Sequence, residues 1–275
     1  MASFERLGRR TWLIRMAGGF LGIWAGLNSE RGRYGWAGWL GWEPRGAAAQ
    51  NGRAETIPVE TELEFEGNVF TVAAFVVVRG QEVAIVDTLL AGNGDRIGAM
   101  IEGAGLDWRA VRHVILTHYH FDHAGSAADI ANRAPQATFW AGEPDIPEVA
   151  LSRPIMAAHD GDEVFGLRII ATPGHTAGHI SVLVPVDSTL MTGDAIFNIG
   201  GQLGLPPAQF SIDMVETLES VRKLGGLNFE RALFGHGIPI ERGAASEFAR
   251  LAAAGSGLLD PHALVDPRHN CLLHA

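Results

Sequence analysis

The most informative segment of this 275-residue chain reads Thr117-His118-Tyr119-His120-Phe121-Asp122-His123. Side chains alternate along an extended segment, so His118 and His120 point the same way and can grip one metal ion. Asp122 and His123 follow where the chain is expected to turn into a helix, so they face a second position beside the first. Three histidines and an aspartate so close together rarely have a purely structural role. The segment therefore predicts a site for two adjacent metal ions.

Three later segments place further metal-ligand residue types where an expected strand runs out into a loop. They are Thr172-Pro173-Gly174-His175, Met191-Thr192-Gly193-Asp194 and Phe234-Gly235-His236-Gly237. A glycine adjoins each ligand candidate and relieves steric crowding where the backbone bends sharply. Alone, His175, Asp194 or His236 would more often be an ordinary loop residue. Their consistent order after the first segment favours one shared site.

Hydrophobic periodicity predicts strands before helices in both halves of the chain. The expected strands are 57–66, 69–79, 82–87, 111–116, 137–141, 167–171, 180–192 with a break at 185–188, and 233–234. The expected helices are 95–103, 123–133, 212–224 and 244–253. This order predicts an α/β domain in which two sheets pack together and helices cover their outer faces.

Composition narrows the class of partner. The net charge is −10, and the body of the chain has no run of lysine or arginine. Proteins that bind along a phosphate backbone need a basic face, so nucleic acid is not expected as a partner. A small-molecule substrate is expected instead. Cys271 is the single cysteine and cannot form an intrachain disulfide. The sequence contains no signal for a particular oligomeric state.

The first 53 residues are expected to be an N-terminal extension and linker, with the metal-binding domain spanning 54–275. Gly8-Arg9-Arg10 followed by the apolar stretch Met16–Leu27 resembles a twin-arginine export signal. That stretch is too short for a stable membrane span, which needs about 20 apolar residues. A periplasmic or extracellular location follows if the signal is used. The cytoplasm is the alternative, with the extension packed on the domain or its start codon assigned too early.

The histidine and aspartate clusters resemble the metallo-β-lactamase superfamily, whose signature is HxHxDH followed by a downstream His, Asp and His. The resemblance covers about Val69 to Ala253 and implies a four-layer αββα sandwich with the site at one edge of the two sheets. It also implies two divalent ions, zinc first with iron or manganese as alternatives. The implied ligands are His118, His120 and His175 for the first ion, Asp122, His123 and His236 for the second, and Asp194 between both.

The expected function is metal-dependent hydrolysis. Two adjacent ions lower the pKa of a bound water to about 7, so that it becomes a nucleophile, and they polarise a carbonyl oxygen. This chemistry cleaves an ester, thioester, lactone or amide bond. Asp122 is the residue expected to orient the nucleophile. Asp87 and His179 are expected to hydrogen-bond to ligands or to their loops without binding a metal ion themselves. No serine lies in a G-x-S-x-G elbow, so a serine hydrolase is not expected.

The resemblance leaves several branches open. True metallo-β-lactamases carry cysteine or serine at the position of Asp194, which argues against an amide-cleaving lactamase. N-acyl homoserine lactonases carry a tyrosine where this chain has Phe197. Glyoxalase II enzymes bind glutathione through basic residues in a helical tail, where this chain has only Arg250 and Arg268.

Three further alternatives are weaker. Phosphodiesterase and nuclease branches need a basic surface, and the persulfide dioxygenases use a single iron held by fewer residues. A metal-stabilised binding protein without catalysis is the alternative of a different class. Such proteins usually lack one or more of the seven ligands, and all seven are present here.

Overall fold

The computed structural model describes residues 54–65 and 67–255. The first sheet contains β1 (Ala54–Phe65), β2 (Asn68–Arg79), β3 (Glu82–Val86), β4 (Val111–Ile115), β5 (Thr138–Gly142) and β6 (Ile155–Ala158). The second contains β7 (Glu163–Val164), β8 (Leu167–Ala171), β9 (Ile180–Val184), β10 (Thr189–Met191) and β13 (Arg231–Leu233). A separate pair is formed by β11 (Phe197–Ile199) and β12 (Gln202–Gly204). The helices are α1 (Gly94–Gly103), α2 (Phe121–Ala124), α3 (Ala127–Arg133), α4 (Met214–Gly225) and α5 (Ala244–Ala254).

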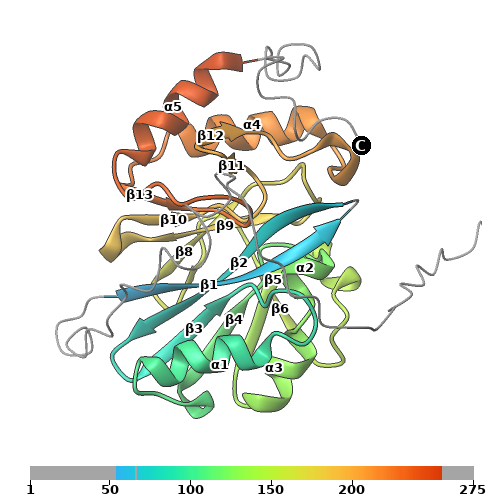
Figure 1. The fold of residues 1–275 in the computed structure, drawn as a ribbon, viewed down its shortest axis with the longest axis vertical. Helices are drawn as coiled ribbons and strands as arrows, with labels where there is room; N and C mark the ends of the chain where they lie inside the picture. Colours follow the sequence, from blue (N-terminus) through green and yellow to red (C-terminus); the bar gives the residue numbers. More distant parts are fainter. Residues whose placement is uncertain (1–53, 66, 256–275) are drawn as a thin grey trace, which may run out of the picture. The chain divides into compact units, whose positions relative to one another are not determined.

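The described residues form four layers (Figure 1). Helices α1 and α3 cover the outer face of the first sheet, and α4 and α5 cover the outer face of the second. The first sheet runs in the order β1-β2-β3-β4-β5-β6, and the second in the order β13-β10-β9-β8-β7. This arrangement is the αββα sandwich that the sequence predicted.

The sequence of β2 explains why this strand lies between two cores. Its side chains alternate, so Val72, Ala74 and Val76 pack toward α1 and α3. Ala73 and Phe75 point the other way and pack against the second sheet. A third core joins the second sheet to α4 and α5. A strand buried on both faces reads as an almost continuous apolar run, which the segment Val72–Val78 is.

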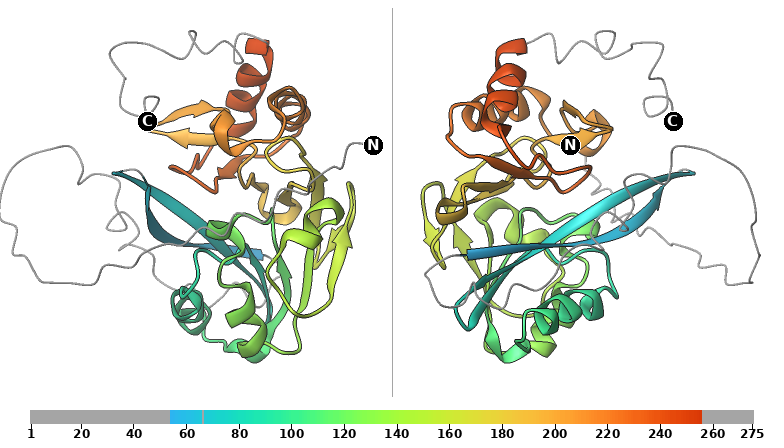
Figure 2. Two further views of the ribbon diagram at one scale, coloured as in Figure 1. Left: turned by 90° about the vertical axis from the view of Figure 1, so that its right-hand side faces the viewer. Right: turned by 60° about the vertical axis from the view of Figure 1, so that its left-hand side comes forward.

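The parallel strands β3, β4 and β5 end at one edge of the first sheet, and strands of the second sheet end nearby. The loops that follow β3, β4, β8, β10 and β13 carry the histidines and aspartates singled out above. Figure 2 shows this edge from two further sides, with the β1–β2 hairpin projecting beyond the rest of the first sheet. Chain topology thus brings together five loops that are far apart in sequence.

The single helix expected over 123–133 is two helices, α2 and α3, separated at Gly125-Ser126. A side chain at Gly125 would lie 2.2 Å from the carbonyl oxygen of Phe121 and 2.5 Å from the backbone nitrogen of Ala91. The Ser126 hydroxyl donates to the carbonyl of Leu90. The helix therefore breaks because this point of the chain packs tightly on the loop after β3.

Other boundaries also differ from the expectation. Helix α4 begins at Met214 rather than Ile212, because the Asp213 side chain caps it by accepting from the backbone N–H groups of Val215 and Glu216. The last strand is Arg231–Leu233 rather than 233–234. The short strands β6, β7, β11 and β12 were not expected at all.

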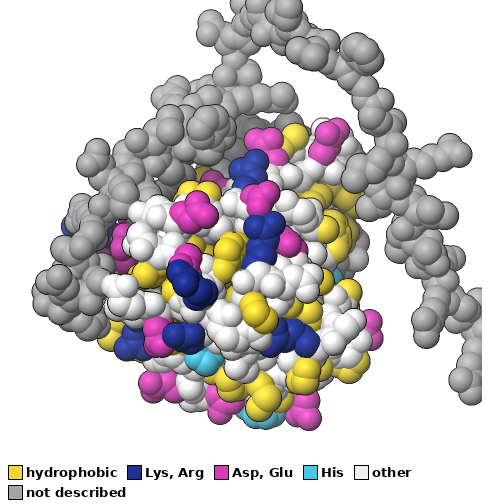
Figure 3. All heavy atoms as spheres, turned by 90° about the horizontal axis from the view of Figure 1, so that it is seen from below, with side chains coloured by type: hydrophobic (Ala, Val, Ile, Leu, Met, Phe, Trp, Pro, Cys, Tyr) yellow, Lys and Arg dark blue, Asp and Glu magenta, His cyan; other side chains and the backbone are white. Residues whose placement is uncertain are grey.

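Two properties of the described residues bear on partners. No helix among them is long and apolar enough to span a bilayer. On the face seen from below in Figure 3, basic and acidic side chains are interspersed. The expected twin-arginine signal and Cys271 lie outside the described residues.

Candidate metal centre

The structure brings all seven predicted ligand residues together at the shared edge of the two sheets. They fall into three overlapping groups whose ligand atoms lie within 4.8 Å of one another. The groups are His118, His120 and His175; His118, His123 and Asp194; and Asp122, His123 and His236. All are buried except His120, which is partly exposed.

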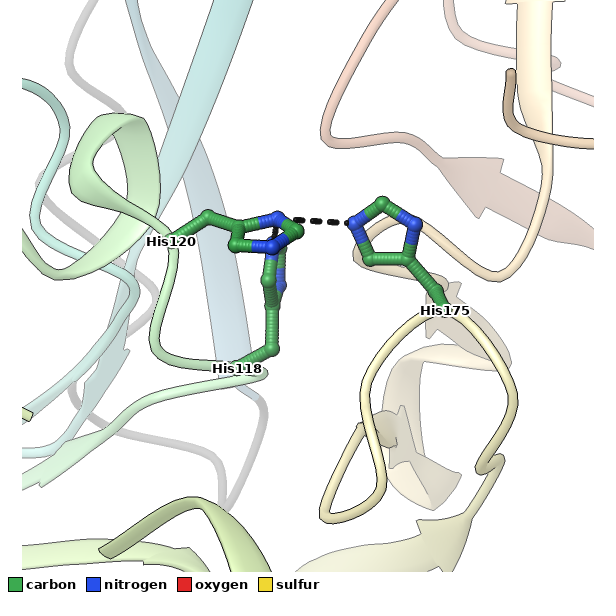
Figure 4. Close-up of side chains that lie close together, drawn as sticks. All are labelled: His118, His120 and His175. Atoms are coloured by element: carbon green, nitrogen blue, oxygen red, sulfur yellow. Dashed lines mark hydrogen bonds between the residues drawn. The ribbon is translucent and has the colours of Figure 1, made fainter. Parts of the chain in front are cut away.

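The first trio consists of His118, His120 and His175 (Figure 4). The Nδ1 atom of His120 lies 3.1 Å from Nε2 of His118 and 3.0 Å from Nε2 of His175. His118 and His120 come from the segment after β4, and His175 comes from the loop after β8. Two sheets therefore each contribute to one small group of ring nitrogens.

The hydrogen-bond partners of His118 determine which of its ring nitrogens carries the proton and which presents a lone pair to the other histidines of the trio. The Thr117 hydroxyl donates to Oδ2 of Asp87, so it can only accept from Nδ1 of His118, at 3.0 Å. Nδ1 therefore carries the proton, and Nε2 presents a lone pair to the trio. His175 has the same arrangement, because its Nδ1 lies 3.1 Å from the Ser211 hydroxyl, which donates to the carbonyl of Pro207.

The second trio, Asp122, His123 and His236, is supported in the same way. Nδ1 of His123 donates to Oδ2 of Asp87 at 2.9 Å, and Nδ1 of His236 donates to the carbonyl of Thr71 at 2.9 Å. Both Nε2 atoms then face inward, 3.4 Å apart. The Oδ2 atom of Asp122 lies 3.3 Å from Nε2 of His236 and 3.8 Å from Nε2 of His123.

Asp194 lies between the two trios. Its Oδ2 is 3.4 Å from Nε2 of His175 in the first trio and 3.4 Å from Nε2 of His236 in the second. Its Oδ1 is 3.2 Å from Nε2 of His123. One carboxylate therefore contacts both groups, which is the position expected of a bridging ligand.

The donor set fits divalent metal ions. Inward-facing imidazole lone pairs 3.0–3.4 Å apart repel one another unless a proton or a cation lies among them. Oδ1 of Asp194 is buried and has no hydrogen-bond partner, although most buried polar atoms have one. Five imidazoles with two carboxylates match the preferences of zinc, iron or manganese.

The two trios differ in charge. Burial lowers the pKa of His118, and it lowers the pKa of His175 to about 4, so these rings are neutral. Burial acts in the same direction on His236, but the charge of Asp194 and hydrogen bonds to Asp122 and Asp194 outweigh it and raise the pKa to about 9. The pKa of His123 rises for a similar reason. Burial would raise the pKa of Asp194, yet His123 and His236 hold it well below its usual range.

Two supporting residues occupy the places that the sequence predicted. Asp87 holds both the His123 ring and, through Thr117, the His118 ring. His179 contacts the turn that bears Asp194, because its Nε2 accepts from the Asp194 backbone N–H at 3.0 Å. Burial lowers the pKa of His179 to about 3, so it accepts as a neutral ring.

Sequence reasoning missed other supports of the site. Asp145, in the short 3-10 helix Glu143–Glu148, accepts from the Thr176 hydroxyl at 2.6 Å and from the Gly178 N–H at 2.7 Å. It thereby fixes the loop that carries His175. Ser211 supports the His175 ring directly. Neither residue lies in a recognisable motif, so only the tertiary structure identifies them.

Gly235 is required by the close packing of the site. A side chain there would lie 2.3 Å from Oδ1 of Asp194 and 2.7 Å from Cε1 of His123. The ring of Tyr119 lies 4.9 Å from that of His120 and packs partly on the core between the first sheet and its helices. The ring of Phe197 lies 4.7 Å from that of His236 and forms an apolar wall.

Comparison with known proteins agrees with this geometry. A profile of the metallo-beta-lactamase superfamily matches residues 67–236. The chain is 32% identical to the probable metallo-hydrolase YflN of Bacillus subtilis, over 50% of this chain and 67% of that protein. It is 29% identical to the thioesterase pkgB of Emericella nidulans, over 46% of this chain and 35% of the thioesterase. The fold resembles a solved metallo beta lactamase from Erythrobacter litoralis, with a TM-score of 0.59, 22% identity, and coverage of 72% and 92%.

Proposed function

The chain belongs to the metallo-beta-lactamase superfamily, and we propose that it is a hydrolase that uses two divalent metal ions to cleave an ester, thioester or lactone bond in a small molecule. The observation that supports this most directly is the position of Asp194, whose Oδ2 lies 3.4 Å from a histidine of each trio. Shared contact of this kind is what a pair of ions needs from a bridging carboxylate. The printed names of two relatives, a probable metallo-hydrolase and a thioesterase, are in keeping with the proposal.

The proposed ligands are the residues of the two trios together with Asp194. When bound, two divalent ions supply a water whose pKa falls to about 7 and a polarised carbonyl on the substrate. Asp122 is the carboxylate best placed to hold a proton of the attacking water, because its side chain is 10% exposed and that of Asp194 only 4%. His118 and His175 keep neutral Nε2 atoms facing the site, since Thr117 and Ser211 accept at their Nδ1 atoms. Phe197 shields one side of His236 from water.

The position of Phe197 favours an ester or thioester over a homoserine lactone. N-acyl homoserine lactonases carry a tyrosine at this position, and its hydroxyl assists the substrate carbonyl. Phe197 presents only a ring, stacked at a tilt on His236. Tyr119 occupies a different position, because its ring lies 4.9 Å from that of His120 in the first trio, whereas Phe197 lies against His236 in the second.

The proposal predicts a stoichiometry. Purified protein should contain about two metal ions per chain, and a chelator should remove both the ions and the hydrolytic activity. Metal analysis would be combined with a screen of p-nitrophenyl esters, a thioester, a lactone and a chromogenic cephalosporin. Fully loaded protein that binds a single ion, or that hydrolyses none of these compounds, would contradict the proposal.

Asp122→Asn separates catalysis from metal binding. The change keeps the side-chain shape but removes the negative charge and the proton acceptor. We expect kcat to fall about 10²–10⁴-fold, the usual contribution of a positioned general base. The first trio does not include Asp122, so at least one ion per chain should remain. Asp129→Asn is the matched control, since Asp129 pairs with Arg133 on α3, far from the trios. An Asp122→Asn enzyme with unchanged kcat would show that a group other than Asp122 accepts the proton of the attacking water.

A further inference from the structure

Large apolar side chains are exposed beside the metal centre. Eight of them are exposed by more than a third in the described part of the chain. Five of the eight lie in three segments of the chain, namely Phe65, Val69, Phe121, Phe210 and Ile212. One of these segments holds proposed ligands, and the other two hold Thr71 and Ser211, which hydrogen-bond to His236 and His175. We call these five side chains the apolar rim. Exposed apolar surface that gathers in one place usually marks a binding site rather than chance.

Each rim segment is tied to the centre by a specific contact. Val69 is two residues before Thr71, whose carbonyl accepts from His236, and it points to the same face of β2 as Ala73 and Phe75. Phe121 stands between His120 and Asp122 in the sequence.

The third segment flanks the residue that supports His175. Phe210 ends the 3-10 helix Ala208–Phe210, and Ile212 follows two residues later. Ser211, between them, accepts from Nδ1 of His175. The Ile212 backbone N–H also donates to the carbonyl of His175, at 3.2 Å. Phe210 and Ile212 therefore flank the residue that supports the His175 ring.

Two rim residues connect opposite halves of the fold. The rings of Phe65, at the end of β1, and Phe210, just before α4, meet edge to face with centroids 5.5 Å apart. The two residues remain 37% and 42% exposed. The end of the β1–β2 hairpin, which projects in Figure 2, thus touches the segment beside His175. The contact leaves ring surface free for a further apolar group.

The segments that carry the rim contain no basic side chain, which favours a neutral substrate group over an anionic one there. The segments 63–71, 119–123 and 205–213 contain no lysine or arginine, and they include Glu64, Asp122 and Asp213. A substrate with phosphates or several carboxylates would find no cation there to pair with. A neutral apolar chain would instead transfer from water onto aromatic and aliphatic surface.

We propose that the apolar rim binds the hydrocarbon part of the substrate, so that the enzyme prefers medium-chain acyl esters or thioesters over short or anionic ones. This inference rests on the proposed hydrolytic function and names the substrate class of the same site. A scissile carbonyl held at the trios would extend its acyl chain toward Phe65 and Phe210.

The test is a chain-length series of p-nitrophenyl esters, from acetyl to octanoyl, on the metal-loaded full chain. We expect kcat/KM to rise about fourfold for each of the first few added methylenes, because burying one methylene stabilises binding by about 0.8 kcal/mol. The double variant Phe65→Ala/Phe210→Ala should lower the octanoyl-to-acetyl ratio of kcat/KM at least about tenfold. Met156→Ala, an exposed apolar residue on β6, is the matched control and should keep the ratio of the parent.

A binding measurement distinguishes failure of the rim from failure of the proposed hydrolysis. Calorimetry should show octanoate binding the metal-loaded protein at least about tenfold more tightly than acetate, with a negative heat-capacity change. If no ester is cleaved but this difference is present and lost in the double variant, the hydrolytic proposal fails and the rim survives. If octanoate and acetate bind equally, or if chain length does not affect kcat/KM, the rim proposal is wrong. It is also wrong if the parent is a dimer that the double variant converts to a monomer, because a second copy then covers the rim.

Discussion

Asp194→Asn should remove both metal ions and lower hydrolysis by on the order of 10³-fold, the upper end of the loss when one preorganised electrostatic group is taken from an active site. The reason is its position between the trios. Its Oδ2 contacts His175 on one side and His236 on the other, and its Oδ1 contacts His123. Asparagine has nearly the same shape but no charge. Both trios therefore lose the negatively charged oxygen that Asp194 provides between them.

Metal content and activity would be measured together for this variant. Atomic emission should give well under one ion per chain at a zinc concentration that fills the parent protein. Circular dichroism should show that the sheets and helices are retained. Asp160→Asn is the control, because Asp160 is exposed, pairs with Lys223 and belongs to neither trio. An Asp194→Asn protein that still holds two ions would show that another residue bridges the two positions.

The grouping of the proposed ligands could be predicted from the sequence because it follows local rules. His118 and His120 share a direction through the alternation of an extended segment, and Asp122 and His123 turn away at the start of α2. Asp194 and His236 follow short strands that end at the same edge of the fold. Which trio each ligand joins came from the resemblance to a family, because strand order decides it and short-range patterns do not.

The supporting residues could not be predicted with the same success. Ser211 accepts from His175, and Asp145 holds the loop after β8, through contacts between residues about 30 or more positions apart. A serine or aspartate in such a segment has no periodic or motif signal. Asp87 was expected only because it ends a strand next to the site. Sequence reasoning therefore identifies candidate metal ligands more easily than the residues that orient them.

The limits of the fold prediction have similar causes. The sequence shows a continuous helical pattern over 123–133, yet Gly125 must approach Ala91 too closely for any side chain. The helix is therefore interrupted by tertiary packing and not by the helix propensity of its residues. Strands of two to four residues, such as β7 and β12, are too short for alternation to be recognised.

The opposite charge states of the two trios predict that their metal sites respond differently to pH. In the metal-free chain the pKa of His236 is about 9, because Asp194 and Asp122 outweigh burial, whereas burial lowers the pKa of His175 to about 4. A folded-state pKa above the usual 6.5 stabilises the fold fully below about pH 6.5. That contribution disappears as the pH rises through about 9. A metal ion at the second trio must displace the His236 proton, whereas one at the first trio meets neutral rings.

The first site should therefore fill at about pH 6, and the affinity of the second should rise about tenfold per pH unit for each displaced proton until about pH 9. Equilibrium dialysis at fixed free zinc would show about one ion per chain at the acidic end and two at the alkaline end. Calorimetry in buffers of different ionisation enthalpy should detect proton release only with the second ion. His159→Gln, a histidine of the β6–β7 loop outside both trios, should leave the two-step profile in place. Two ions that bind in parallel at every pH would contradict the assignment of the His236 proton, because both sites would then compete with protons to the same extent.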